Sequence, residues 1–74
     1  MDYKDRITSD PNVMLGKPII KGTRITVDLI LKKLSEDLTV DQILEAYPHL
    51  SREDVLAALS YSAEVISKEE IIAN

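Results

Sequence analysis

Cysteine, tryptophan and phenylalanine are absent from this 74-residue sequence, which has two glycines and one histidine. Without cysteine the chain can form no disulfide framework and no thiolate metal site, so we expect a cytoplasmic location. The apolar runs are too short to cross a bilayer, and the polar start from Met1 to Arg6 is unlike a signal peptide. The sequence therefore predicts a cytoplasmic protein with no membrane-bound part.

Catalytic side chains are equally scarce. The single histidine, His49, lies in a predicted turn with no cysteine to pair with. Adjacent carboxylates such as Glu53 and Asp54 point in different directions from a helix, so they form no ready acid–base pair or metal cage. The spacing of Gly16 and Gly22 lacks the lysine and the strand-to-helix setting of a phosphate loop. We therefore expect no enzymatic activity, no cofactor and no metal.

Charge is distributed unevenly along the chain, whose net charge is −4. Residues 1–33 contain seven basic and four acidic side chains, whereas residues 34–74 contain two basic and nine acidic ones. A polyanion would be attracted to the first part and a basic protein to the second. The alternative is a solvated acidic surface that keeps a small protein soluble.

Both glycines lie in the segment 16–27, which predicts a short hairpin. Gly22 follows two β-branched residues and a lysine, and it supplies the positive φ of a tight turn. Pro18 lacks an N–H group, which places it at a strand start or a sheet edge. We expect a hairpin over about residues 7–26 that brings three cations close together: Lys17, Lys21 and Arg24.

Four hydroxyl residues have the pattern of helix N-caps, each preceded by an apolar residue and followed two positions later by an acidic one: Thr26, Thr39, Ser51 and Ser67. The apolar periodicity agrees with these starts. Together they predict helices over 27–35, 40–46 and 52–66, with a short C-terminal helix over 68–73. On the third helix the expected core face consists of Val55, Leu59, Ala63 and Ile66, with Leu56 and Ala58 beside them.

The link between the second and third predicted helices has the layout of a helix-turn-helix pair. The second helix ends before Tyr47-Pro48, and the four-residue link 47–50 leads directly into the longer third helix. A chain of this length buries about 60% of its unfolded surface, so its core is small and self-association as a homodimer is expected. We therefore predict a mainly α fold: a three-helix, helix-turn-helix-like (homeodomain-like) bundle with a short N-terminal β-hairpin.

Four short blocks resemble one known family. They are Asp10-Pro11, Gly16-Lys17-Pro18, Gly22-Thr23-Arg24-Ile25 and Tyr47-Pro48-His49-Leu50. Together they look like the bacterial and archaeal family called domain of unknown function 433, and the resemblance spans roughly Arg6 to Ala63. It implies a small trihelical, helix-turn-helix-like domain, many of whose relatives are antitoxin-like proteins encoded beside a PIN-like ribonuclease toxin.

Three positions depart from the family pattern. Met14-Leu15 precede Gly16 where the family often has a small residue or glycine, and Ile19 stands where cysteine is common. Ser35-Glu36-Asp37 replace the usual small residue and glycine between the first two helices. Asp37 must therefore adopt the conformation that glycine would take freely.

The resemblance and the residues together predict an antitoxin-like partner of a PIN-type ribonuclease, which neutralises this toxin and represses its own operon by binding operator DNA. The expected nucleic-acid contacts are Lys17, Lys21, Arg24 and Arg52. For Arg24, an ion pair with Asp10 or with a helix is an equal alternative. Lys32 is expected to pair with Asp28, four positions before it.

The expected partner contacts are aliphatic residues late in the sequence: Val65, Ile66, Ile71 and Ile72. The alternative for Ile71 and Ile72 is packing against the helical core. A different functional class also fits the acidic third helix, namely a dimeric protein-interaction module that binds no DNA. The salt dependence of DNA binding discriminates between these two functions.

Overall fold

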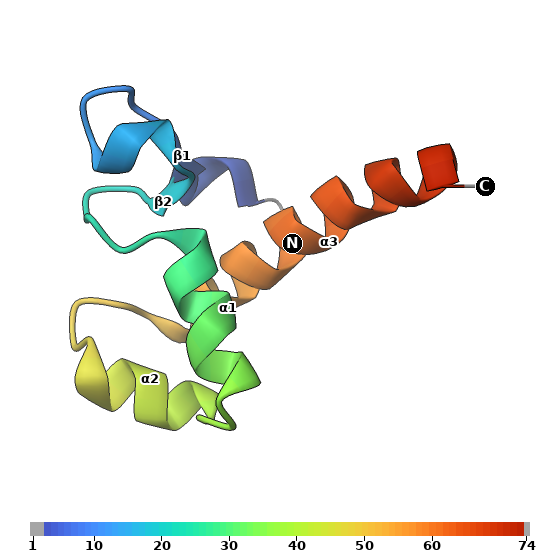
Figure 1. Cartoon of the computed structure of the whole chain (residues 1–74). Coiled ribbons are helices and arrows are strands. Elements are labelled where there is room, and N and C mark those ends of the chain that lie inside the picture. Colours follow the sequence, from blue (N-terminus) through green and yellow to red (C-terminus); the bar gives the residue numbers. More distant parts are fainter. Residues whose placement is uncertain (1–2, 74) are drawn as a thin grey trace.

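The elements follow one another in the order expected from the sequence. The structure, a computed structural model, describes residues 3–73, with side chains described as far as Lys68. Over this range the chain forms a two-stranded sheet and then three α-helices: β1 (Ile7–Thr8), β2 (Ile19–Ile20), α1 (Val27–Ser35), α2 (Val40–Ala46) and α3 (Arg52–Ala73). Short 3₁₀ turns lie at Tyr3–Asp5 and Met14–Gly16. The predicted mainly α, three-helix fold with an N-terminal hairpin is confirmed (Figure 1).

Side-chain caps fix the starts of all three helices. The Thr26 hydroxyl accepts a hydrogen bond from the Leu29 N–H at 3.2 Å. At α2, the Thr39 hydroxyl accepts from the Gln42 N–H at 3.1 Å, and the Gln42 side chain accepts from the Thr39 N–H at 2.8 Å. This reciprocal pair satisfies two donors that have no partner within a helix.

The third start uses aspartate in place of the usual glutamate or glutamine. The Ser51 hydroxyl accepts from the Asp54 N–H at 3.2 Å, and the Asp54 carboxylate accepts from the Ser51 N–H at 2.9 Å. The three predicted caps at Thr26, Thr39 and Ser51 are thus confirmed, and the chain needs no glycine or proline to begin these helices.

The predicted fourth start at Ser67 is wrong. α3 runs without a break from Arg52 to Ala73, so residues 68–73 continue this helix and do not form a separate one. No glycine or proline lies between positions 52 and 73, and an ion pair between Lys68 and Glu64 at 3.5 Å spans the position of Ser67. A residue that suits an N-cap does not by itself end the helix that precedes it.

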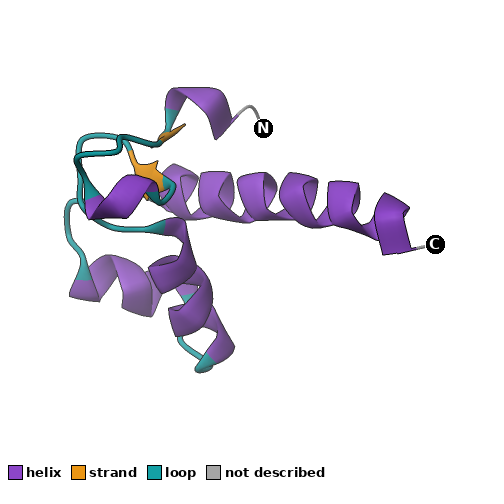
Figure 2. Ribbon diagram, turned by 45° about the horizontal axis from the view of Figure 1, so that its top comes forward, coloured by secondary structure: helices purple, strands orange, loops and turns teal. Residues whose placement is uncertain are grey.

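The core lies where β2, α1 and α2 meet α3. Its buried aliphatic residues come from β2, the three helices and the link between α2 and α3: Ile20, Val27, Ile30, Ile43, Leu50, Val55 and Ala58. Burial of such side chains is the main favourable contribution to folding in a domain of this size. Figure 2 shows the second half of α3 extending beyond the rest of the molecule, so that half contributes little to this core.

The predicted core face of α3 is therefore only partly right. Val55 is fully buried, whereas Leu59 is 40% exposed and Ile66 is 60% exposed. Ala63 is exposed as well. The other elements reach α3 on the side of Val55 and Ala58, which leaves Leu59, Ala63 and Ile66 on a different side of the helix. Sequence periodicity predicted one broad apolar surface on α3, but it did not indicate which part of that surface the other elements cover.

The sheet joins two segments that the sequence did not pair. β1 and β2 are antiparallel, with Ile7 opposite Ile20 and Thr8 opposite Ile19. On the other side of β2, Ile19 forms an isolated bridge with Thr26. The chain reverses between these two residues, and Gly22 in this reversal has a φ of 81°. The predicted glycine turn is confirmed, and β2 occupies the middle position between β1 and the bridge.

Left-handed backbone occurs at two of the three places where the sequence departs from the family pattern. Met14, Leu15 and Gly16 have φ values of 50°, 59° and 79°, so two bulky residues share a conformation that favours glycine. Asp37 has a φ of 71°. Its N–H donates to the Leu34 carbonyl at 3.1 Å, as in a glycine-terminated helix end. The expectation that Asp37 replaces a glycine conformation is confirmed.

Candidate protein-binding surface

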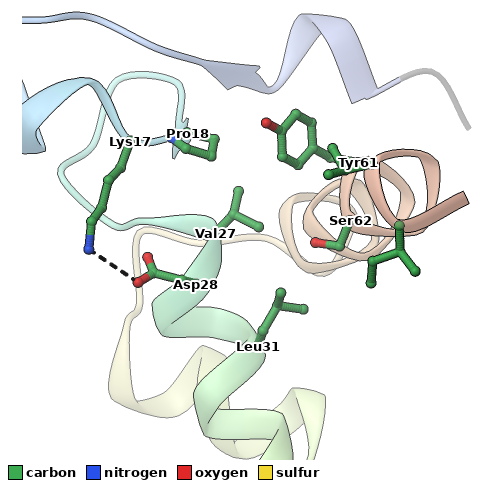
Figure 3. A pocket seen from close by; sticks show the side chains of 9 residues that line it. Lys17, Pro18, Val27, Asp28, Leu31, Tyr61 and Ser62 are labelled. Carbon is green, nitrogen blue, oxygen red and sulfur yellow. Dashed lines mark hydrogen bonds and ion pairs between the residues drawn. The ribbon is translucent and has the colours of Figure 1, made fainter. Parts of the chain in front are cut away.

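An apolar hollow lies between α1, the second half of α3 and the Lys17-Pro18 segment. Its volume is about 360 Å³. The lining residues are Lys17, Pro18, Val27, Asp28, Leu31, Tyr61, Ser62, Val65 and Ile66. Figure 3 shows Val27 and Leu31 of α1 pointing towards α3, with Tyr61 of α3 near Pro18. The first helix begins here because Thr26 caps it, and this cap sets the positions of Val27 and Leu31.

One ion pair lies at the edge of this hollow. The Lys17 ammonium is 3.4 Å from the Asp28 carboxylate (Figure 3). A hydrogen bond from the Thr26 side chain, followed by the interaction with Lys17, lowers the pKa of Asp28 below its ordinary value. Asp28 also lies in the first turn of α1, where the helix dipole favours a negative charge.

The Lys17–Asp28 ion pair bears on two predictions: that Asp28 pairs with Lys32, and that Lys17 contacts phosphate. Asp28 pairs with Lys17 and not with Lys32, because the segment before Pro18 runs beside the start of α1. The charge of Lys17 is therefore partly neutralised within the molecule. Lys33, next to Lys32, lies 3.9 Å from Glu36 in the last turn of α1. Lys17 is thus a weaker candidate for phosphate contact than the sequence suggested.

The exposed side chains of α3 form the second part of the candidate surface. Val65 is 39% exposed and Ile66 60% exposed, and both border the hollow. The structure thus places these two predicted partner contacts at an accessible apolar site. The side chains of the other two, Ile71 and Ile72, lie outside the described residues, and so does the alternative that they pack against the core.

An acidic group lies on the same half of α3. The Tyr3 hydroxyl donates a hydrogen bond to the Glu64 carboxylate at 2.5 Å, and Lys68 lies 3.5 Å away. These two contacts, with the Tyr3 hydrogen bond first, lower the pKa of Glu64. The rings of Tyr3 and Tyr61 pack edge to face with centroids 5.3 Å apart. The N-terminal segment is thereby attached to α3 beside an ionised carboxylate.

The remaining predicted cations lie away from the apolar hollow. Lys21 and Arg24 are exposed. Arg24 borders a second hollow of about 620 Å³, and Asp10 lies on the same hollow. Neither cation forms an ion pair with a side chain in the described part of the chain, so the alternative of an Arg24–Asp10 ion pair is wrong. Lys17 borders the apolar hollow and pairs with Asp28, whereas Arg24 borders the second hollow.

The start of α3 is covered in a way that the sequence did not indicate. The Arg6 guanidinium donates to the Asp54 carboxylate at 3.0 Å and to the Ser51 hydroxyl at 3.5 Å. Arg52 is exposed, but it lies next to Glu53 and two residues from this ion pair. No spacing rule links Arg6 to Asp54, because 48 positions separate them and their contact depends on the whole fold.

Within the described part of the chain, no three histidine, cysteine, aspartate or glutamate side chains are grouped as metal ligands. No described helix combines the length and the apolar character needed to cross a membrane.

Comparison with known proteins gives relatives whose roles are undescribed. The family model described as "Protein of unknown function (DUF433)" matches residues 7–62. The uncharacterized protein y4eO of Sinorhizobium fredii is 30% identical over 59 residues, which cover 80% of this chain and 27% of that protein. An uncharacterized protein of Archaeoglobus fulgidus is 62% identical over 24 residues, which cover 32% of this chain and 67% of that protein. The chain thus spans about a quarter of the length of the Sinorhizobium relative.

A solved structure has the same fold. The crystal structure of a DUF433 member protein from Anabaena variabilis matches with a TM-score of 0.81 and 28% sequence identity. The match covers 96% of this chain and 71% of that chain. The likeness therefore extends over nearly all of the described elements, beyond the residues that the family model matches.

Proposed function

This chain belongs to the DUF433 family of proteins of unknown function, and we propose that it acts within it as a protein-binding module, an antitoxin-like partner that neutralises a PIN-type ribonuclease. The resemblance of the sequence blocks supplies the class of partner. One observation carries the choice of a protein partner: exposed Val65 and Ile66 on α3 border an apolar hollow against α1. Such a surface fits an inserted apolar side chain or helix face.

Charge favours a basic partner at this surface. Residues 34–74 carry nine acidic and two basic side chains, and Glu64 is held in its ionised form beside Val65. A ribonuclease that binds the phosphates of RNA needs a basic surface. The apolar hollow would supply most of the affinity, and the acidic residues of this part of the chain, Glu64 among them, would supply the attraction over longer distances.

The test is binding to a ribonuclease of the PIN class encoded next to this protein. We expect the purified pair to form a complex and the ribonuclease to lose activity in it. Val65→Glu should weaken binding by about tenfold or more, since burying an unpaired carboxylate at a contact costs more than about 1 kcal/mol.

The matched control is Leu15→Glu, which adds the same charge at a residue that is 93% exposed and away from the hollow. It should bind like the unaltered protein. An unchanged affinity for Val65→Glu would show that the hollow is not the contact, and the absence of any complex would count against the antitoxin role.

A second candidate function, autoregulation by binding operator DNA as a homodimer, is favoured by a separate observation. Lys21 and Arg24 are exposed and have no ion pair with a described side chain. They are therefore available for phosphate contacts, whereas Arg52 has Glu53 and Asp54 beside it. Without DNA binding, the alternative is a dimeric protein-interaction module.

A further inference from the structure

A second apolar surface on α3 faces away from the core. Leu56, Leu59, Ala63 and Ile66 follow one another at intervals of three, four and three residues, which is the spacing of a helix-pairing seam. Leu56 and Leu59 are each 40% exposed, Ile66 is 60% exposed, and Ala63 is exposed too. We call these four residues the α3 stripe. Nothing in the described part of the chain covers it fully.

Three serines flank the α3 stripe. Ser60 and Ser67 each follow a stripe residue, and Ser62 precedes Ala63. In paired helices these flanking positions usually carry the charges that select a partner. Here they leave a neutral strip with room for close approach on a protein whose net charge is −4. Between positions 56 and 66, two copies of an acidic chain can therefore meet along this strip without placing like charges against each other.

We propose that the α3 stripe is a self-association surface covered by a second copy of this chain, with the two α3 helices antiparallel about an axis near Tyr61. In this register Leu56 faces Ile66 of the partner subunit. Leu59 then faces Ala63 of the partner subunit, and the small alanine makes room for the leucine. Each of these two contacts then occurs twice in the dimer, once on each side of the axis, as two-fold symmetry requires.

Two observations select the antiparallel direction. A parallel pair would place Arg52 and Glu53 against the same residues of the other copy, so like charges would meet. In the antiparallel register, Arg52 comes opposite position 70, which is a glutamate, so opposite charges meet at that level. The second half of α3 also extends away from the molecule (Figure 1). Antiparallel pairing lays this half along the first half of the other α3.

The α3 stripe shares Ile66 with the hollow, but Leu59 does not border the hollow, so a substitution of Leu59 tests self-association separately from ribonuclease binding. Light scattering at micromolar concentration should give a mass of twice the 8.3 kDa of one chain. Leu59→Glu should reduce the mass to that of one chain, while circular dichroism shows an unchanged helix content. A monomeric unaltered protein would overturn the proposal and would leave the stripe to a different partner.

Val65→Glu is the matched control for this substitution. Val65 is 39% exposed against 40% for Leu59, and both lie on α3, but Val65 borders the hollow. We expect Val65→Glu to remain dimeric. Loss of the dimer in both variants, or in neither, would overturn the assignment of the interface to the α3 stripe. The same two variants thus report separately on self-association and on ribonuclease binding.

Cross-linking tests the direction, since the chain has no cysteine of its own. Leu56→Cys and Ile66→Cys are prepared as two proteins of different tag length, mixed and oxidised with a copper–phenanthroline catalyst. The antiparallel register predicts disulfides that join position 56 of one copy to position 66 of the other. Disulfides that join each position to itself would overturn this register.

Discussion

Gly22 is the residue on which the turn before α1 depends. Its φ of 81° is left-handed, and a β-carbon built there has no atom within 4 Å. A side chain therefore meets open space, and the cost of a substitution comes from the backbone conformation. We expect Gly22→Val to destabilise the fold by about 1 kcal/mol or more, measured by urea unfolding. Gly22→Asn should cost less, because asparagine tolerates this region. Equal stability of all three proteins would contradict the assigned turn.

Asp28 gives one residue-level source of pH dependence. Its pKa is lowered in the folded state from an ordinary value of 3.8, mainly by the Thr26 hydrogen bond and then by Lys17. A lowered pKa contributes stability that is present above the ordinary value and is lost as the pH falls through the folded value. Asp28→Asn should therefore flatten the loss of stability below about pH 4.

Asp41→Asn is the control for this pH dependence. Asp41 occupies the same second position in α2 and is exposed, and it forms no ion pair with a described side chain. Thermal unfolding between pH 2 and 7 compares the two variants. An acid limb as steep in Asp28→Asn as in the unaltered protein would show that Asp28 contributes nothing to it.

At the scale of elements, the start of α3 joins the helices to the N-terminal segment. Asp54 caps the helix through the Ser51 N–H and also pairs with Arg6. Asp54→Ala should therefore destabilise the fold by about 1 kcal/mol or more, since it removes both contacts. Glu53→Ala, at an exposed neighbour without an ion pair to a described side chain, should change stability little. If chemical unfolding gave the same midpoint for both variants, this role of Asp54 would be wrong.

At the scale of the whole molecule, salt separates DNA binding from protein binding. If the protein binds operator DNA, its affinity should fall as the salt concentration rises. Lys21→Ala should reduce the slope of log affinity against log salt concentration by about one per protomer, and it should weaken binding to all DNA sequences alike. Arg52→Ala should cost about 1–3 kcal/mol on a specific site and little on other DNA. Fluorescence anisotropy with the DNA upstream of its own reading frame measures both effects.

The control for this titration is a carrier protein of similar isoelectric point, about 4.8. Suppose that at low salt the protein binds this DNA no better than the carrier does. The DNA function would then be excluded, and the interaction module without DNA binding would be the remaining function.

The sequence predicted those parts of the structure that depend on neighbouring residues. Thr26 and Thr39 cap helices because each hydroxyl reaches an N–H three positions away. Gly22 and Asp37 adopt left-handed backbone because a turn and a helix end require it at those positions. Each of these features is decided within a few residues, so one sequence is enough to indicate it.

Features that depend on distant parts of the chain were missed. The contact of Arg6 with Asp54 joins residues 48 positions apart, and the burial of Ala58 but not Leu59 depends on where α1 and α2 lie. For the candidate surface, Val65 and Ile66 were predicted as partner contacts, whereas the hollow beside them was not. That hollow exists because Pro18 and α1 approach α3, and this approach is a property of the complete fold.

The attachment of Tyr3 to α3 also implies an order of events in time. The two residues joined by the Tyr3–Glu64 hydrogen bond are 61 positions apart, and closing a loop of that length costs roughly 3–4 kcal/mol of chain entropy. Residues that contact one another in the helical core are closer together in the sequence than Tyr3 and Glu64 are. During folding we therefore expect the three helices to assemble before the N-terminal segment docks. The same segment would then detach first when the molecule opens. The cap of α3 would thus lose its Arg6 contact while the helical core is still intact.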